Sequence, residues 1–316
     1  MLRQLAFNLP FDIPSSSDFS EPHVKANILL QNHFSRKPLP ADLQGDQRLI
    51  LEQAVRLVHA MVDVISSSTG SQTEAENDED ALASSCNLRP AILCMELSQM
   101  IVQALWMNQS PLLQLPYLNK NMTERLRTEA GVEDIADFMN MEDALRERLI
   151  PLPEQQMVHL AGVCNRYPNL ELIIKNEEGD LRLDMATASE TPLDLAVMIR
   201  RDIDEADFSS KEEYLEELKT FAQPVDAPLY PLQKDENWWV LVGQPSANRL
   251  LSIKKITSMQ QKASLTQTLA LQIHKKFLLS EKAENQKRKV IDLKVYLICD
   301  SYIGCDLEKS VQIKLY

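Results

Sequence analysis

The chain has 316 residues, of which 44% are hydrophobic and 25% charged, and 33 basic against 46 acidic side chains give a net charge of −13. This composition is ordinary for globular domains, and the length predicts two or three of them. The acidic balance excludes a protein that neutralises phosphates over its whole surface, although a local basic patch is compatible with it. We therefore expect a chain that folds as several domains.

Neither a membrane segment nor a metal site is indicated. The longest apolar stretch, residues 92–107, is interrupted by polar side chains and falls short of the ~20 apolar residues of a membrane-spanning helix. No secretory signal is visible at the N-terminus. The five cysteines form no Cys-x-x-Cys pair, which predicts a reduced, intracellular compartment and buried thiols. We expect a soluble protein that is not exported.

The first third of the chain predicts a helical bundle over residues 23–118, after a Pro- and Ser-rich linker at 1–22. Ser20 and Pro22 have the residue types that begin a helix. A second, longer helix is predicted from about residue 46 to 66, because apolar residues recur there at helical spacing. These residues are Ile50, Ala54, Leu57, Val58, Met61 and Ile65.

Pro90 begins a third predicted helix, so densely apolar that we expect neighbours on nearly all sides. Before it, residues 66–87 are polar, carry five acidic side chains and show no apolar period. Such a segment buries too little apolar surface to offset the entropy of ordering it, so we expect a disordered loop. A phosphorylatable acidic interaction loop is the alternative.

Shorter helices are predicted over residues 119–168. Thr123 can cap a helix that ends at Gly131, and Asn140 has an acidic residue three positions later, a near capping box. Pro153 begins the last helix, which a Tyr-Pro pair ends. Together these helices predict a compact helix-loop-helix module.

The remainder, residues 169–316, predicts a β-sandwich of immunoglobulin or fibronectin type, because short strand-like runs follow one another with gaps too short for crossover helices. The runs are residues 170–175, 193–200, 238–243, 250–256, 265–273, 290–299 and 311–316. Two longer gaps, acidic at 202–217 and basic at 275–289, are expected to be hairpin insertions. They are interpreted as solvated loops, with a charge-guided docking contact as the alternative.

No motif for catalysis, cofactor binding or metal binding is present. None of the seven glycines forms a P-loop or a dinucleotide-binding turn. The five histidines fall on different predicted elements without the spacing of metal ligands, and no serine lies in a Gly-x-Ser-x-Gly turn. The sequence therefore predicts a non-enzymatic module with no catalytic residue, cofactor or metal.

Two sets of residues are candidate contacts for RNA or a protein partner. The helix-loop-helix arginines can follow a strand backbone, but interleaved glutamates favour solvated helix faces: Arg125, Arg127, Arg146, Arg148 and Arg166. Trp238 and Trp239 are neighbours on a strand and must point to opposite faces. The inward ring is core, whereas an outward ring, if uncovered, would anchor a partner.

Ten segments, in one order along the chain, carry a resemblance to a known family. They are NILLQ at 27–31, LPADL at 39–43, MELSQM at 95–100, QALW at 103–106, LQLP at 113–116, MNMED at 139–143, NRYPN at 165–169, NWWVLVG at 237–243, LSIKK at 251–255 and CDSYIGCD at 299–306. The sequence resembles the Sec-sixty-three homology unit that follows the motor domains of large spliceosomal Ski-two-like RNA helicases.

The resemblance implies a helical bundle, a helix-loop-helix unit, a fibronectin-like sandwich and a nuclear location. In that family, a unit behind an active motor helps to form the channel for the threaded strand, whereas the unit behind the C-terminal cassette serves as a docking platform. This sequence looks most like the latter. The implied role is support of U4/U6 duplex unwinding and pre-mRNA splicing, with helicase motor domains and splicing factors as partners, and single-stranded RNA as the alternative.

Overall fold

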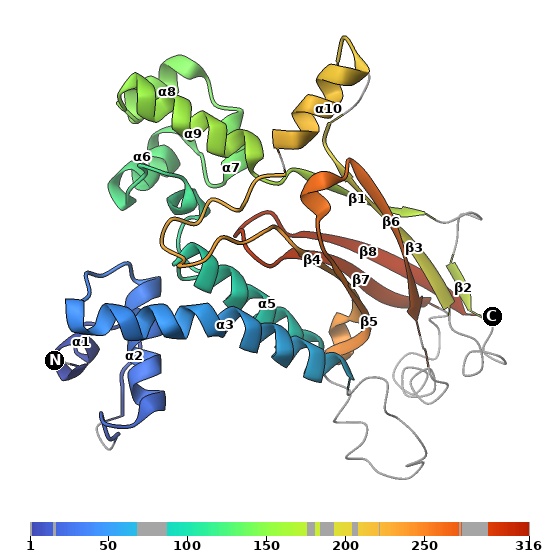
Figure 1. The fold of residues 1–316 in the computed structure, drawn as a ribbon. Coiled ribbons are helices and arrows are strands. Elements are labelled where there is room, and N and C mark those ends of the chain that lie inside the picture. The colour runs from blue at the N-terminus through green and yellow to red at the C-terminus, as the bar shows by residue number, and fades with distance from the viewer. Residues whose placement is uncertain are drawn as a thin grey trace.

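The computed structural model describes residues 2–14, 17–67, 87–175, 181–183, 193–203, 208–220, 222–271, 273 and 290–315 (Figure 1). Helices make up the chain up to residue 166, and antiparallel sheets dominate from residue 170 onward. The predicted α+β class and the order of helical half before β half are therefore confirmed. The predicted loop at 66–87 and the basic gap at 275–289 lie outside the described residues, apart from the ends of the former.

The N-terminal segment differs from the predicted linker. It contains helix α1 (Leu2–Ala6) and packs against helix α2 (Pro22–Phe34), with Leu9 buried beside Val24 and Ile28. Apolar residues spaced along the segment explain this packing, which a Pro-rich composition conceals. Helix α2 begins at the predicted proline, but Glu21 stands at its N-cap position and no side chain caps it.

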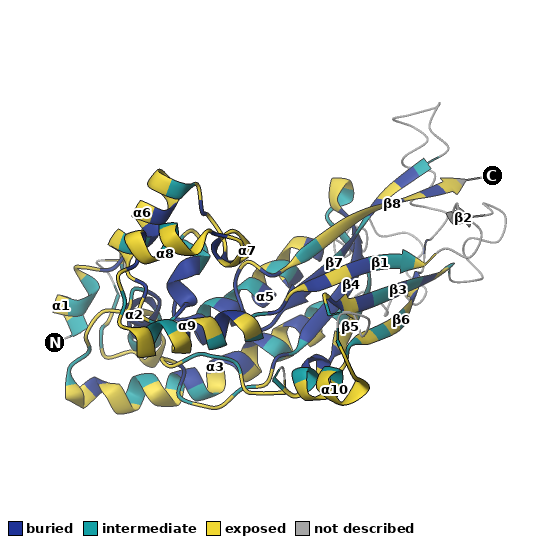
Figure 2. Ribbon diagram, turned by 90° about the horizontal axis from the view of Figure 1, so that it is seen from above, coloured by how far each residue is buried: buried dark blue, intermediate teal, exposed yellow. Residues whose placement is uncertain are grey.

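Helices α3 (Ala41–Ser67) and α5 (Leu88–Gln103) pack against each other and form the centre of the helical half. Helix α5 is largely buried, as its composition predicts (Figure 2). On α3 the predicted apolar stripe is wrong in part, because Leu57 and Met61 are exposed. The buried face lies one position to the side and comprises Leu43, Leu51, Ala54, Val55, Val58 and Val62.

A second group of helices has its own apolar core, which includes Leu126, Phe138, Leu149 and Leu160. It comprises η1 (Pro111–Gln114), α6 (Lys120–Ala130), α7 (Ile135–Met139), α8 (Asp143–Leu149) and α9 (Glu154–Arg166).

Two of the ends predicted for this second group are confirmed, and two of its caps are wrong. Gly131, at φ +68°, ends α6, and Pro153 stands at the N-cap position of α9. Asn119 rather than Thr123 caps α6, and no side chain caps α8.

Each of the seven predicted runs overlaps a strand, and one further short strand, β2, is found. The strands are β1 (Leu170–Lys175), β2 (Leu181–Leu183), β3 (Leu193–Arg201), β4 (Trp238–Gln244), β5 (Arg249–Ile256), β6 (Ser264–Leu271), β7 (Val290–Cys299) and β8 (Leu307–Leu315). They form a three-stranded sheet in the order β1-β3-β6 and a five-stranded sheet in the order β2-β8-β7-β4-β5. Neighbouring strands are antiparallel except in the β2–β8 pair.

The five-stranded sheet is covered on both faces. Alternate residues of β4, among them Trp238 and Val240, share one core with β3 of the other sheet. The residues between them, Trp239 and Leu241, share a second core with α3 and α5. Every residue of β4 is consequently buried, which is why its run reads as continuously apolar.

The acidic gap at 202–217 is not a hairpin insertion in its described part. Residues from Lys211 to Thr220 form helix α10 instead. The backbone N–H of Glu213 donates to Ser210 Oγ, so Ser210 caps this helix, and the Glu213 carboxylate accepts from the N–H and the hydroxyl of Ser209.

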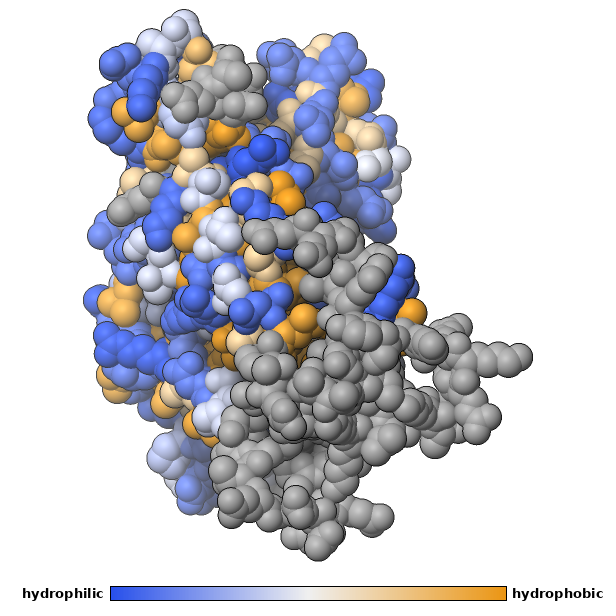
Figure 3. Space-filling model, turned by 90° about the vertical axis from the view of Figure 1, so that its right-hand side faces the viewer, coloured by the Kyte–Doolittle hydropathy of each residue, from blue (hydrophilic) through white to orange (hydrophobic). Residues whose placement is uncertain are grey.

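Helices α6, α8 and α10 expose much of their length (Figure 2). On the face drawn in Figure 3, hydrophilic residues cover much of the described surface and hydrophobic ones lie among them. In the described residues, no helix is long and apolar enough to cross a membrane.

Candidate functional site at the junction of helices and sheets

The loop between β7 and β8, residues 300–306, is held by one face of α5. Ser98 Oγ donates to the carbonyl oxygen of Asp300 at 2.8 Å, and Gln103 Nε2 donates to that of Ser301 at 3.0 Å. Between them, Gln99 Nε2 donates to the carbonyl oxygen of Cys299 at 2.9 Å. These polar side chains of a largely apolar helix are buried because the loop supplies their acceptors.

The second group of helices holds the same loop at Ile303. The Gln114 side chain donates to the Ile303 carbonyl at 2.7 Å and accepts from its N–H at 3.1 Å, like a backbone partner. Tyr167, the residue after α9, donates its hydroxyl to the same carbonyl at 2.8 Å. The next residue, Gly304, has φ +88° and lies so close to Pro111 that a Cβ would approach it to 3.2 Å.

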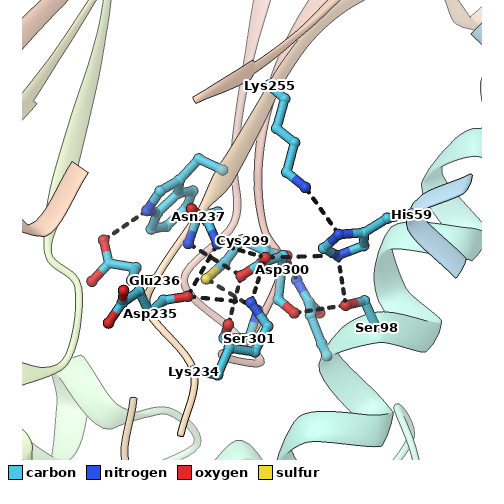
Figure 4. Close-up of polar contacts among 12 residues, drawn as sticks. His59, Ser98, Lys234, Asp235, Glu236, Asn237, Lys255, Cys299, Asp300 and Ser301 are labelled. Atoms are coloured by element: carbon cyan, nitrogen blue, oxygen red, sulfur yellow. Dashed lines mark hydrogen bonds and ion pairs between the residues drawn. The ribbon is translucent and has the colours of Figure 1, made fainter. Parts of the chain in front are cut away.

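Polar groups from the segment before β4 contact the side chain of Asp300 (Figure 4). Its side chain is fully buried, and Lys234 Nζ lies 2.5 Å from Oδ2. The backbone N–H of Asn237 donates to Oδ1 at 3.1 Å, and Ser301 Oγ donates to the same oxygen at 2.5 Å. The buried carboxylate is therefore paired with a cation and hydrogen bonded, as a stable buried charge requires.

His59 of α3 joins this cluster from the helical side. Lys255 Nζ of β5 lies 2.9 Å from His59 Nδ1, and because an ammonium only donates, Nδ1 accepts. Burial, together with the charge of Lys255, lowers the pKa of His59 from 6.5 to about 4. The imidazole is therefore neutral at physiological pH, with its remaining proton on Nε2.

Ser98, His59 and Asp300 are the residue types of a hydrolytic triad, but their geometry differs from one. Ser98 Oγ and Asp300 Oδ2 approach the same ring nitrogen, His59 Nε2, at 3.4 and 3.7 Å. In a triad, the nucleophile and the carboxylate occupy opposite ring nitrogens. Ser98 is also fully buried and already donates to a carbonyl, so the arrangement joins helix to sheet and does not activate a nucleophile.

Asp306, at the other end of the loop, is bound by the same face of α5. Its carboxylate accepts from Gln99 Nε2 at 3.0 and 2.8 Å and from the N–H of Cys299 at 2.8 Å. Burial raises the pKa of Asp306 to about 6, because the two hydrogen-bonding groups offset the loss of water only in part.

A buried ion pair links the two sheets. Arg201, the last residue of β3, places Nη2 2.7 Å from Glu236 Oε1, and Trp238 Nε1 donates to the same oxygen at 2.7 Å. Glu236 is the shared acceptor, so its removal would take a buried hydrogen-bond partner from both Arg201 and Trp238.

The five candidate arginines are not gathered by the structure into one free basic surface. Arg125 pairs with Glu129 at 3.2 Å, and Arg127 pairs with Glu124 at 2.7 Å. Arg148 is exposed on α8. These three arginines can meet a strand only in competition with acids of the same helices, or as isolated charges.

The other two arginines lie in structural positions. Arg146 pairs with Asp143 and donates to the carbonyl oxygens of three residues around the α7–α8 turn, including Met141 at 2.7 Å. Arg166 lies half-buried near Asp226. Burial raises the pKa of Asp226, and the charges of His159 and Arg166 oppose this rise. Arg146 thus holds its own turn, and Arg166 faces the segment before β4.

Trp238 and Trp239 do point to opposite faces, but both are covered. Trp238 is 0% exposed in the core between the sheets, and Trp239 is 2% exposed beneath α3. The Trp239 ring meets the His59 ring edge-on at a centroid distance of 4.9 Å. The condition for a tryptophan anchor, an uncovered ring, is therefore not met within this chain.

The described residues offer little to catalysis. They contain no cluster of His, Cys, Asp and Glu that could hold a metal ion. The four described cysteines are buried, and burial raises their thiol pKa values, that of Cys164 to about 11. Thiolate chemistry is correspondingly suppressed.

Sequence reasoning missed the junction, although two signals were present. Polar Ser98, Gln99 and Gln103 interrupt an otherwise apolar helix, which indicates buried partners. The segment at 299–306 was noted only for its resemblance. That these two meet depends on the tertiary arrangement, because about 200 residues separate them.

The fold and this junction define a class of protein, a multidomain α+β unit of helices and sheets joined by a common loop. The chain belongs to the Sec63 Brl domain family, whose model matches residues 1–312. Units of this family accompany helicases and are not themselves the ATPase motor. The predicted family resemblance is thereby confirmed.

Similar proteins support the same placement. The chain is 35% identical to the U5 small nuclear ribonucleoprotein 200 kDa helicases of Drosophila melanogaster and Homo sapiens, over 100% and 99% of its length. It is 34% identical to an activating signal cointegrator 1 complex subunit 3-like protein of Dictyostelium discoideum over 98% of its length. In each case the chain spans 12% of the relative. The small nuclear ribonucleoprotein relatives agree with the predicted nuclear location.

Proposed function

We propose that this chain is a non-catalytic accessory and protein-interaction module of a spliceosomal RNA helicase, which supports U4/U6 duplex unwinding and pre-mRNA splicing by docking motor domains and splicing factors. The observation that carries the proposal is the junction around residues 300–306. Side chains from α5, from the second helical group and from the segment before β4 all bind this loop. Such a joint holds several surfaces in fixed relation, as a docking platform requires.

The proposal includes the finer architecture. We infer an immunoglobulin-type sandwich over residues 169–316, since two sheets share one core and β2 pairs in parallel with the last strand. The helical bundle extends over 23–118, with the N-terminal segment packed on it, and the helix-loop-helix unit over 119–168 has its own core. The separate core of the helix-loop-helix unit supports its boundaries, whereas the bundle shares a core with the five-stranded sheet.

The absence of a P-loop from the sequence and the geometry around His59 favour a role without turnover. The net charge of −13 and the pairing of Arg125 and Arg127 with glutamates favour protein partners over RNA. RNA guiding by the helix-loop-helix arginines is the second candidate, and exposed Arg148 is the residue that favours it.

Capture from nuclear extract tests the docking role. The purified, tagged chain is incubated with extract treated with ribonuclease, and bound proteins are identified by mass spectrometry. We expect motor domains or splicing factors to stay bound, because protein surfaces carry the contact. Loss of all such partners after ribonuclease treatment would contradict docking.

A salt titration with single-stranded RNA tests the second candidate. The chain is compared with a variant carrying Arg125→Gln, Arg127→Gln and Arg148→Gln, and with a control carrying Arg48→Gln, Lys211→Gln and Lys219→Gln. Docking alone predicts weak binding that both variants leave unchanged. Salt-sensitive binding that only the first variant loses would establish RNA guiding. An ATPase assay of the chain, expected to be negative, completes the test.

A further inference from the structure

Lys255 of β5 lies beside the ring nitrogen of His59 that Asp300 does not approach (Figure 4). In the β4–β5 pair, Lys255 is directly opposite Trp239, and residues opposite each other share one face of a sheet. Trp239 packs in the core beneath α3, the helix that carries His59. The strand register therefore brings the lysine to the helical face, where its Nζ lies 2.9 Å from His59 Nδ1.

The imidazole of His59 has an amine at one nitrogen and a carboxylate near the other. Asp300 Oδ2 lies 3.7 Å from Nε2, and Lys255 Nζ is at Nδ1. In this arrangement a histidine accepts a proton from a nucleophile, and the carboxylate stabilises the imidazolium that forms. Ser98 lacks this relationship, because its hydroxyl approaches the same nitrogen as Asp300. Lys255 is thus the nucleophile that the geometry of His59 suits.

The amine of Lys255 is accessible and loses its proton more readily than that of a free lysine. The residue as a whole is exposed, while its Nζ lies against the His59 ring and 5.6 Å from the centroid of the Trp239 ring. This partial burial lowers the pKa of Lys255 from 10.5; the carboxylates of Asp300 and Asp63 oppose the shift, and the Lys234 ammonium adds to it. More of the lysine is consequently the free amine, the form that attacks a carbonyl.

We propose that Lys255 is a site of Nε-acylation by small acyl thioesters, with His59 as the acceptor of the proton from the attacking amine. The free amine adds to the thioester carbonyl carbon and forms a carbon–nitrogen bond. The nitrogen of this adduct is far more acidic than an ammonium, so even the weakly basic Nδ1 of His59 takes its proton. The carbon–sulfur bond then breaks, and the leaving thiolate receives the proton from His59. The products are an amide on Lys255 and a free thiol.

The groups around the amine favour a thioester over an ordinary ester or an amide. His59 supplies a base, whereas the nearby ammonium of Lys234, a potential acid, is held by Asp300 at 2.5 Å. A thiol ionises near pH 8.5, on the order of the cysteine value, so a thiolate leaves without an acid to protonate it. An alkoxide or an amine anion needs such an acid.

Acylation changes the charge at the junction once and involves no turnover, so the inference goes beyond the proposed docking function and does not depend on it. The modified side chain loses its positive charge and its cation–π contact with Trp239. The charge of Lys255 is one of the causes that lower the pKa of His59, so this pKa rises when Lys255 is acylated. The histidine therefore reports on the modification of the lysine.

Acetyl-coenzyme A is the probe. The full 316-residue chain is incubated with it at neutral pH, and the acetylation of each lysine is followed in time by mass spectrometry with fragment-ion assignment. Lys254 is a matched internal control, because it is the next residue of β5, is exposed and lies opposite Val240 on the other face. We expect Lys255 to react at least about tenfold faster than Lys254.

Two variants test the role of His59. His59→Asn keeps a hydrogen-bond acceptor but does not take up a proton at neutral pH, and it should lose most of the excess rate at Lys255. His59→Phe keeps an aromatic ring against Trp239 and should have the same effect. The thermal midpoint of each variant shows whether it is folded. If both variants unfold, the comparison of Lys255 with Lys254 in the parent chain still decides.

A carbon-detected NMR titration gives a second readout. After acetylation of Lys255, the pKa of His59 should rise from about 4. In a Lys255→Arg chain, acetylation at Lys254 should leave the His59 titration unchanged. Three results would overturn the proposal: equal rates at Lys254 and Lys255, an excess rate that persists in folded His59 variants, and a His59 pKa that acetylation of Lys255 does not move.

Discussion

The side-chain amide of Gln99 in α5 donates to both carboxylate oxygens of Asp306, at 3.0 and 2.8 Å. The same amide reaches the carbonyl of Cys299, so a single helical residue binds both ends of the β7–β8 loop. Gln99 is buried and Asp306 lies at the surface, so the carboxylate is shielded from water only in part, and this partial desolvation raises its pKa. The ionisation of Asp306 is therefore linked to the stability of the junction.

Asp306 makes part of the folding stability depend on pH. Burial raises its pKa from 3.8 to about 6, so the folded state binds the proton more tightly than the unfolded state. Its contribution is present in full below the unfolded value and is lost as pH rises through about 6. Because Asp306 is exposed at the surface, solvent screens its carboxylate, and the change should be smaller than the pKa shift alone implies.

Urea denaturation of the parent and Asp306→Asn chains, between about pH 4 and pH 7, measures this contribution. The Asn variant should lack that component of the pH dependence. Asp292→Asn, an exposed carboxylate on β7, should retain it. The assignment is wrong if the parent and Asp306→Asn curves run parallel.

Gly243 of β4 is required by the close approach of α5. A Cβ at this position would lie 2.6 Å from Leu88 Cδ1 and 2.9 Å from the Arg249 carbonyl oxygen. Gly243→Ala should therefore destabilise the chain by about 1–3 kcal/mol. Gly45 in α3 has nothing within 4 Å of such a Cβ, so Gly45→Ala should stabilise by about 0.5–1 kcal/mol. Chemical denaturation of both variants checks this opposite pair of signs.

The imidazole of His59 should remain neutral through the range in which free histidine titrates. Burial and Lys255 lower its pKa from 6.5 to about 4, so its contribution to stability is present above 6.5 and is lost as pH falls through about 4. A carbon-detected NMR titration reads the ring directly. Lys255→Met removes the neighbouring cation and should raise the pKa, whereas an inflection near 6.5 in the parent chain would refute the buried position.

Trp239 holds the helical half on the five-stranded sheet. Trp239→Ala should cost about 3–5 kcal/mol, because the ring fills the core shared by α3, α5 and β4. The loss should also speed limited proteolysis between helices and sheet. Leu57→Ala, at an exposed position of the same helical half, should change stability by less than about 0.5 kcal/mol. Equal losses from the two variants would exclude this role for Trp239.

Local signals in the sequence located most elements. Gly131 and the Tyr167–Pro168 pair end helices through backbone geometry that depends on a few neighbours, and the apolar runs of β1, β4 and β7 match their strands. Helix α10 was missed because its acidic composition outweighed the N-cap residue Ser210. Such errors arise where composition and local chemistry disagree.

The burial of individual faces was less predictable. Periodicity indicates that α3 has an apolar stripe but not which of two overlapping stripes faces a neighbour, and Leu57 and Met61 fell on the exposed side. The outward ring of Trp239 was a candidate anchor until α3 was seen to cover it. Whether the candidate arginines are paired with glutamates was also hard to predict, since it depends on side chains one helical turn away.

The sequence by itself determined the class of fold, the order of its parts and its family, because helix ends, strand runs and ordered motifs are written in neighbouring residues. Only the tertiary structure decided which buried polar groups meet. Ser98, Gln99 and Gln114 find their acceptors some 200 residues away on the loop after β7. Contacts of this kind depend on how the two halves pack, and packing is a property of the whole chain.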